Sequence, residues 1–183
     1  MASSVWHRVK SSDPIARALR DRHYSTKHPG GRTVGPPGRR LVLVSDDEHA
    51  LWVTHWPDAQ LVLDGIDALR CTVFRREGRR RERASVLIAA AMALSEAYFG
   101  PAPQGWLTYV EPSKVRSQEP GYCFKMAGFE LDAAFTHRRL IRLRRGAVGA
   151  HSGPLLLTGD RGPLAIPGRT VGASLRQLAL EFA

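Results

Sequence analysis

The stretch PGYCFKMAGFE, residues 120–130, carries the strongest structural signal in this chain. Residues 119–127 have helical spacing, and Gly128 is suited to end that helix in a left-handed conformation, which costs glycine little. Phe129 then opens the next strand. Because GWLTYVE at 105–111 has the composition of a strand, this region predicts a closing unit of strand, short helix, glycine turn and strand.

Other strands and helices precede and follow this unit. A hairpin is expected around the turn residues Asp46-Asp47-Glu48. Residues 82–98 are apolar on almost every side, so we expect a core helix that packs against a sheet. The stretch 23–40, rich in Gly, Pro and basic residues, is a loop long enough to carry function. The sequence predicts strands over 5–10, 41–45, 49–56, 68–76 and 137–145, and helices over 11–22 and 82–98. The arginines of the strand at 137–145 are expected to face solvent or a ligand.

Composition indicates one globular domain with an anionic partner. The chain has 183 residues, of which 43% are hydrophobic. A formal charge of +10 and a pI near 10.6 favour nucleic acid over an acidic small molecule. The longest apolar run, at 86–94, is far shorter than the ~20 residues of a membrane span, and no signal-peptide core is visible. Cys71 and Cys123 lack CxxC spacing, which indicates buried thiols in a cytoplasmic protein.

The order of these elements, closed by a strand, a short helix and Gly-Phe, resembles the GNAT acyltransferase fold. The resemblance covers residues 5–145 and implies an α/β protein with a central mixed, twisted sheet flanked by helices. Residues 1–145 are expected to form this catalytic domain. Residues 146–183 are expected to form a Gly- and Pro-containing C-terminal extension, with a strand-like PLLLT and an amphipathic VGASLRQLALEF, that could cover the cleft or pair with a second subunit.

The loop before the core helix departs from the GNAT pattern. In the family, Arg/Gln-x-x-Gly-x-Gly/Ala wraps the coenzyme A pyrophosphate with backbone amides at the helix N-terminus. Here the loop reads FRREGRRRERAS, and Arg83 stands where a glycine is usual, which places acetyl-CoA binding in doubt. Arginine side chains could hold a phosphate instead, of a cofactor or of DNA. The candidate cofactor-binding residues are Arg79, Arg80, Arg81, Arg83 and Ser85.

A second departure lies in the closing unit. Many GNAT enzymes have a tyrosine four residues before the glycine of Gly-Phe, where its hydroxyl can protonate the leaving thiolate. This chain has Phe124 there, so either another residue is the acid or the reaction differs. Tyr122 is the nearest replacement, although on an ideal helix it points about 200° away from Phe124 unless it lies in the first turn. Tyr122 either takes part in catalysis or packs.

Two short motifs narrow the resemblance. HYS at 23–25 and VEPSKVRSQEPGYCFKMAGF at 110–129 together resemble the Mom-type DNA-modification proteins of bacteriophages, a divergent GNAT-like family without the usual coenzyme A loop. The resemblance implies a transferase that adds a carbamoylmethyl-like group to the exocyclic amine of adenine in double-stranded DNA and so protects the DNA from restriction. It also implies that a His-Tyr pair, here His23 and Tyr24, is associated with iron.

The residue types are compatible with that metal and also with a simpler role. A phenolate and an imidazole suit iron better than zinc, and His28, His55, Glu111 or water could complete the ligand set. Alternatively, Tyr24 stacks on a base or packs while His23 caps the preceding helix.

Glu111 ends the strand after the core helix, at the edge where this fold separates its central strands. Its carboxylate could accept a proton from the attacking amine or pair with Lys114 or Arg116. An adenine in a duplex must be extruded into a pocket that stacks it, and Trp52 and Trp56 are expected in the core or on a sheet face instead. The candidate catalytic residues are Glu111, Tyr122 and Tyr24, and the candidate DNA contacts are Lys27, Arg32, Lys114 and Arg116.

Two other functions fit the sequence. The first is a coenzyme A-dependent GNAT N-acetyltransferase acting on a protein or a small amine, which would have to bind acetyl-CoA despite Arg83. The second is a DNA-binding protein without catalytic activity, in which replacing Glu111, His23 and Tyr24 would leave its activity intact.

Overall fold

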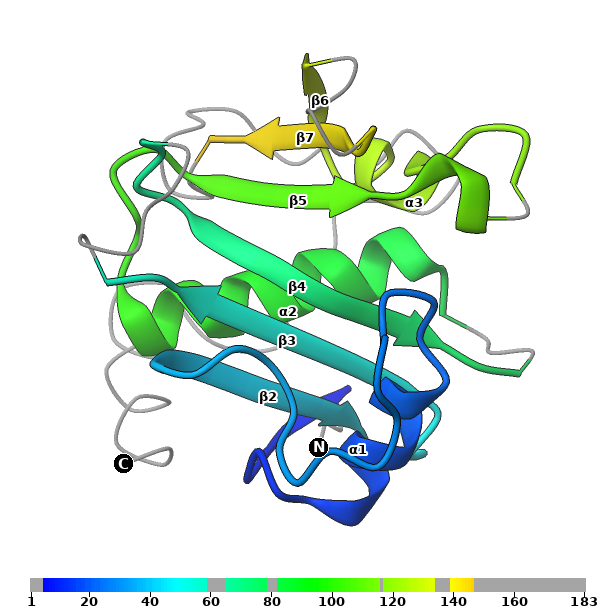
Figure 1. Cartoon of the computed structure of the whole chain (residues 1–183). Coiled ribbons are helices and arrows are strands. Elements are labelled where there is room, and N and C mark those ends of the chain that lie inside the picture. Colours follow the sequence, from blue (N-terminus) through cyan, green and yellow to red (C-terminus); the bar gives the residue numbers. More distant parts are fainter. Residues whose placement is uncertain (1–4, 59–64, 79–81, 116, 134–138, 147–183) are drawn as a thin grey trace.

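The computed structural model describes residues 5–58, 65–78, 82–115, 117–133 and 139–146. They form a seven-stranded mixed sheet with α2 on one face and α1 on the other (Figure 1). The elements are β1 (Trp6–Val9), α1 (Pro14–Asp21), β2 (Arg39–Ser45), β3 (Ala50–Trp56), β4 (Leu69–Arg76), α2 (Ala84–Phe99), β5 (Trp106–Val110), the 3₁₀ turn η2 (Pro112–Lys114), α3 (Tyr122–Lys125), β6 (Glu130–Ala133) and β7 (Ile141–Arg145). Each element predicted over residues 5–145 is present, although α3 is shorter than expected.

Local sequence explains where α1 begins and where α2 ends. The Asp13 carboxylate caps α1 by accepting a hydrogen bond from the Ala16 N–H at 2.9 Å, and Pro14 occupies the first turn. Gly100, with φ of 84°, ends α2. Apolar residues of α2 such as Met92 are fully buried, which confirms the predicted core helix. Among the described residues, no helix is long and apolar enough to cross a membrane.

The sheet has one parallel pair, at its centre. The strand order is β1-β2-β3-β4-β5-β7-β6, and β4 and β5 run parallel while all the other neighbours are antiparallel. Pairing of β4 with β5 runs from Leu69 opposite Trp106 to Cys71 opposite Thr108. Both strands continue beyond these residues, but they are no longer paired with each other. The two central strands therefore separate after Cys71 and Thr108.

An irregularity in β4 occurs at the same place. Val53 of β3 pairs with Val73, but the next residue, Thr54, pairs with Cys71, so Thr72 is an extra residue on β4. An extra residue of this kind bends its strand and increases the local twist. The bend in β4 thus coincides with the separation of β4 from β5.

The closing unit has the predicted glycine turn. Gly128 has φ of 88°, and its N–H donates to the Lys125 carbonyl at 2.9 Å. The Phe129 N–H donates to the Phe124 carbonyl at 3.0 Å. These two bonds form a Schellman motif. Phe129 is buried, and β6 begins one residue later, at Glu130.

The expectation that the arginines of residues 137–145 face solvent or a ligand is wrong for Arg145. Its side chain lies in the core against α2, and the Nη1 group donates to the Ala127 carbonyl. The reason is that β7 lies between β5 and β6, so alternate residues point into the core. Arg142 and Arg144 lie on the opposite face and pair with Asp132, at 2.5 and 3.8 Å. The predicted extension beyond Gly146 lies outside the described residues.

Candidate active site

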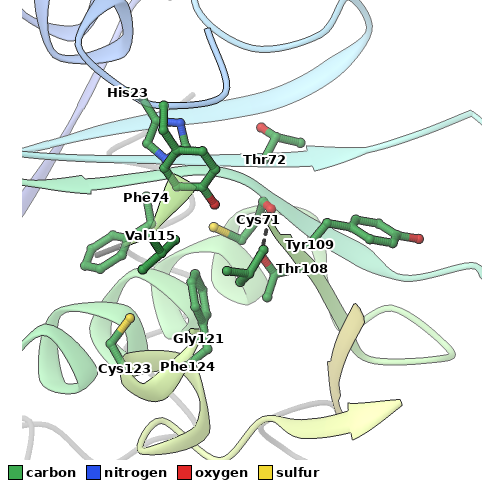
Figure 2. Close-up of a pocket in the computed structure, with 12 residues that line it drawn as sticks. His23, Cys71, Thr72, Phe74, Thr108, Tyr109, Val115, Gly121, Cys123 and Phe124 are labelled. Atoms are coloured by element: carbon green, nitrogen blue, oxygen red, sulfur yellow. Dashed lines mark hydrogen bonds between the residues drawn. The ribbon is translucent and has the colours of Figure 1, made fainter. Parts of the chain in front are cut away.

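A pocket of about 150 Å³ lies where β4 and β5 separate (Figure 2). Figure 2 shows His23 on one side of it, Phe124 and Gly121 on the other, and Cys71 and Thr108 between them. Its walls are mostly apolar, with hydroxyl and thiol groups among them. The lining residues are His23 and Tyr24 after α1, Cys71, Thr72 and Phe74 of β4, Thr108, Tyr109 and Val110 of β5, and Val115, Gly121, Cys123 and Phe124.

Tyr24 brings a phenol into this pocket from the loop after α1. Its side chain stays partly exposed, and a backbone hydrogen bond from Glu111 reaches its hydroxyl. Burial is the main cause that raises the pKa of this phenol above its usual value, and the Glu111 bond opposes that shift. At neutral pH the group is therefore protonated and can donate a proton.

His23 anchors the loop that carries Tyr24. It is 8% exposed, and its ring lies 4.3 Å from that of Tyr24, with an interplanar angle of 30°. The Ser25 N–H donates to His23 Nδ1 at 3.2 Å, so Nδ1 is an acceptor and the neutral ring carries its proton on Nε2. Burial, with the charge of Arg75, lowers the pKa of His23 to about 4, against a smaller opposing effect from a backbone hydrogen bond to Phe74.

The His23–Tyr24 pair does not fit an iron site in this conformation. The imidazole hydrogen-bonds Ser25 and the Phe74 backbone, and the Tyr24 hydroxyl hydrogen-bonds the Glu111 backbone, so the ligand atoms of both side chains already have protein partners. His55 hydrogen-bonds the Pro37 carbonyl instead, at 3.1 Å. No group of three or more His, Cys, Asp or Glu side chains with a metal-binding arrangement occurs within the described part of the chain.

Of the other two candidate catalytic residues, Glu111 lies next to the pocket and Tyr122 lies outside its lining. Glu111 directly follows the pocket-lining Val110; its backbone contacts the Tyr24 hydroxyl, and its carboxylate accepts a hydrogen bond from Ser113 Oγ at 3.2 Å. Tyr122 is 52% exposed and is not among the lining residues. Phe124, at the position of the usual GNAT tyrosine, does line the pocket.

Of the remaining candidates, four lie outside the described residues: Arg79, Arg80, Arg81 and Arg116. Arg83 is exposed at the N-terminus of α2 and makes no capping hydrogen bond with its side chain. Ser85 is buried. Lys27, Arg32 and Lys114 are exposed, and Lys114 directly precedes the pocket-lining Val115. Trp52 is fully buried, as expected.

Sequence reasoning missed an ion cluster beside the pocket. Arg22 and Arg75 both bind the carboxylate of Glu77, which lowers the pKa of that group to about 2, the hydrogen bond from Arg22 being the largest cause. Arg22 is 55 residues from Glu77 in the sequence, so no local pattern signals the contact. The thiol of Cys71 and the hydroxyl of Thr108 were missed for the same reason.

Comparison with known protein families, curated proteins and solved structures found no match.

Proposed function

We propose that this chain is a GNAT-like transferase that adds a small, carbamoylmethyl-like group to the exocyclic amine of adenine in double-stranded DNA. The GNAT-like part is supported by the strand order and by the central parallel pair, which α2 connects and which separates after Cys71 and Thr108. Separated parallel strands leave a crevice at their carboxyl ends, where α/β proteins bind ligands.

The observation that carries the proposal is the pocket in that crevice, with Tyr24 among its lining residues. Its cavity volume is about 150 Å³. Drug-sized ligands occupy pockets of ~300 Å³ or more. The size therefore suits a single base or a small transferred group. Phe74 and Phe124 supply aromatic surface against which a planar base can stack.

Basic residues lie close in sequence to lining residues in three segments of the pocket wall. Arg22 and Lys27 flank His23 and Tyr24, Arg75 and Arg76 follow Phe74, and Lys114 precedes Val115. The carboxylates as close in sequence to these segments are those of Asp21, Glu77 and Glu111. The excess of positive charge around an apolar pocket suits a base that is presented by a phosphate backbone.

The proposed reaction is a transfer from a donor that carries the group on an electrophilic carbon bonded to a leaving heteroatom. The adenine amine nitrogen forms the new C–N bond with its lone pair, and the bond from carbon to the leaving heteroatom breaks with its electron pair. The Glu111 carboxylate accepts the proton that the amine loses, and the Tyr24 hydroxyl donates a proton to the leaving atom.

The test is to express the protein with a plasmid, digest the plasmid to nucleosides and measure their masses. We expect a new mass on deoxyadenosine with the wild type. Tyr24→Phe should lower the modified fraction about 100-fold, because it removes only the proton donor. Tyr98→Phe, which removes a hydroxyl outside the pocket lining, is the matched control and should leave the modified fraction unchanged.

Unmodified nucleosides from a folded wild-type protein that binds the plasmid would favour the DNA-binding protein without catalytic activity. Tyr122→Phe tests the competing assignment of the proton donor. Loss of the product in that variant, with Tyr24→Phe active, would transfer the role to Tyr122.

A coenzyme A-dependent N-acetyltransferase is the second candidate, because the separation of β4 from β5 offers unpaired strand edges to an elongated cofactor as well. Calorimetric titration with acetyl-CoA distinguishes the two functions. Tight binding despite Arg83 would favour the acetyltransferase.

A further inference from the structure

One carboxylate, that of Glu77, holds two arginine side chains at the end of β4. Arg22 donates from Nε to Glu77 Oε1 at 2.7 Å and from Nη2 to Oε2 at 2.9 Å. Arg75 donates from Nε to the same Oε1 at 2.5 Å, and its Nη1 donates to the Arg22 carbonyl. Two guanidinium groups from distant parts of the chain thus converge on a single anion.

This cluster lies beside the pocket and is open to solvent. Arg22 immediately precedes His23, which lines the pocket, and the charge of Arg75 acts on the His23 ring. The Arg22 side chain is 50% exposed, that of Arg75 28% and that of Glu77 23%. An external anion can therefore reach the guanidinium groups next to the loop that carries Tyr24.

We propose that Arg22 and Arg75 form a binding site for a DNA backbone phosphate, and that Glu77 occupies this site in the free protein. The inference rests on the proposed function, because it identifies where the DNA backbone contacts the protein when a base enters the pocket. A phosphate presents acceptor oxygens much as a carboxylate does, and the planar fork of arginine binds either one bidentately.

When a phosphate displaces the Glu77 carboxylate from Arg22 and Arg75, both guanidinium groups still have an anionic partner. This exchange also makes Glu77 a competitor of DNA. If Glu77 is a competitor, removing its charge while keeping its shape will strengthen DNA binding. If Glu77 only ties α1 to β4, removing its charge will loosen the loop and weaken binding.

The experiment measures the affinity of purified full-length variants for a short fluorescent DNA duplex by anisotropy, over a series of salt concentrations. Glu77→Gln should bind about 3- to 10-fold more tightly than the wild type, with a similar slope of log K against log salt, because both complexes contact the same phosphate and the variant only lacks the competing carboxylate. Arg22→Lys keeps the charge but lacks the fork, and should bind about 5-fold more weakly.

Matched controls separate this site from general charge effects. Glu130→Gln removes an exposed carboxylate on β6, and Arg139→Gln an exposed arginine before β7. The gain from Glu77→Gln should exceed that from Glu130→Gln, and it should disappear when Arg22→Gln is added, because the two residues share one site. Thermal unfolding checks that each variant is folded.

Equal effects of Glu77→Gln and Glu130→Gln, or a gain that persists with Arg22→Gln, would overturn the phosphate site. So would an Arg22→Lys variant that binds as tightly as Arg139→Gln. Plasmid modification by the wild type would in each case leave the proposed function standing. Lack of DNA binding by both the wild type and Glu77→Gln, together with unmodified plasmid, would count against both proposals.

Discussion

At the scale of single residues, Gly121 of the pocket wall lies so close to its neighbours that it leaves no room for a side chain. It has φ of 81°, and a Cβ there would lie 2.7 Å from Cδ1 of Leu143, a fully buried core residue. Gly121→Ala should cost about 1–2 kcal/mol for the left-handed backbone and about 1–3 kcal/mol more for overpacking. Urea unfolding of the variant and the wild type measures this loss.

Gly30 is the matched control for that substitution. Its φ is 82°, but nothing lies within 4 Å of a Cβ built on it. Gly30→Ala should therefore lose only the backbone contribution, about 1–2 kcal/mol. Equal losses in the two variants would show that Leu143 does not constrain Gly121.

At the scale of the elements, Glu77 ties the residue after α1 to the end of β4, and this tie makes stability depend on pH. The pKa of Glu77 is lowered from 4.5 to about 2, mainly by the hydrogen bond from Arg22. A carboxylate whose pKa is lower in the folded state stabilises the fold above its unfolded pKa, and this stabilisation is lost as pH falls through the folded value. The contribution of Glu77 should thus be complete above pH 4.5 and decline toward pH 2.

Glu77→Gln measures that contribution. At pH 7 the variant should be less stable than the wild type by about 1 kcal/mol or less, because Arg22 is half exposed and solvent screens the pair. The difference in unfolding free energy between the two proteins should shrink as the pH falls to 2. A difference that stays constant over this range would mean that the ion pair does not contribute to stability.

At the scale of the whole molecule, the charge of +10 predicts DNA binding that weakens steeply with salt. If the five basic residues beside the pocket neutralise four phosphates, because Arg22 and Arg75 share one, the slope of log K against log salt should be about −4, or an affinity loss of about 10²-fold between ~50 and ~200 mM salt. Fluorescence anisotropy with a DNA duplex measures the slope. A peptide nucleic acid duplex of the same sequence lacks phosphates and should bind far more weakly.

Salt-independent binding would contradict a phosphate interface. Because the basic residues come from separate segments, the prediction also depends on the fold bringing them to one side of the pocket. The same charges scattered over the whole surface would give the same net charge, but fewer of them could contact phosphates at once, and the slope of log K against log salt would be shallower.

Much of the architecture could be predicted from neighbouring residues alone. Asp13 and Pro14 mark a helix start, and Gly100 and Gly128 mark two helix ends, because capping and left-handed turns depend on residues within one or two helical turns. The burial of Trp52 agrees with its apolar strand, although β3 is buried on both faces, so alternation alone does not single it out. These are local preferences of the backbone, so short stretches of the amino-acid sequence contain them in full.

The site required the folded chain. The separation of β4 from β5, the extra residue Thr72, the burial of Arg145 and the ion cluster around Glu77 all depend on strand register and on contacts between distant residues. Gly128 shows both levels. Its positive φ was expected from the helix end, but only the tertiary structure shows that a Cβ there would also lie 3.3 Å from the Arg145 guanidinium. Distances of this kind arise from packing, which no local stretch of sequence specifies.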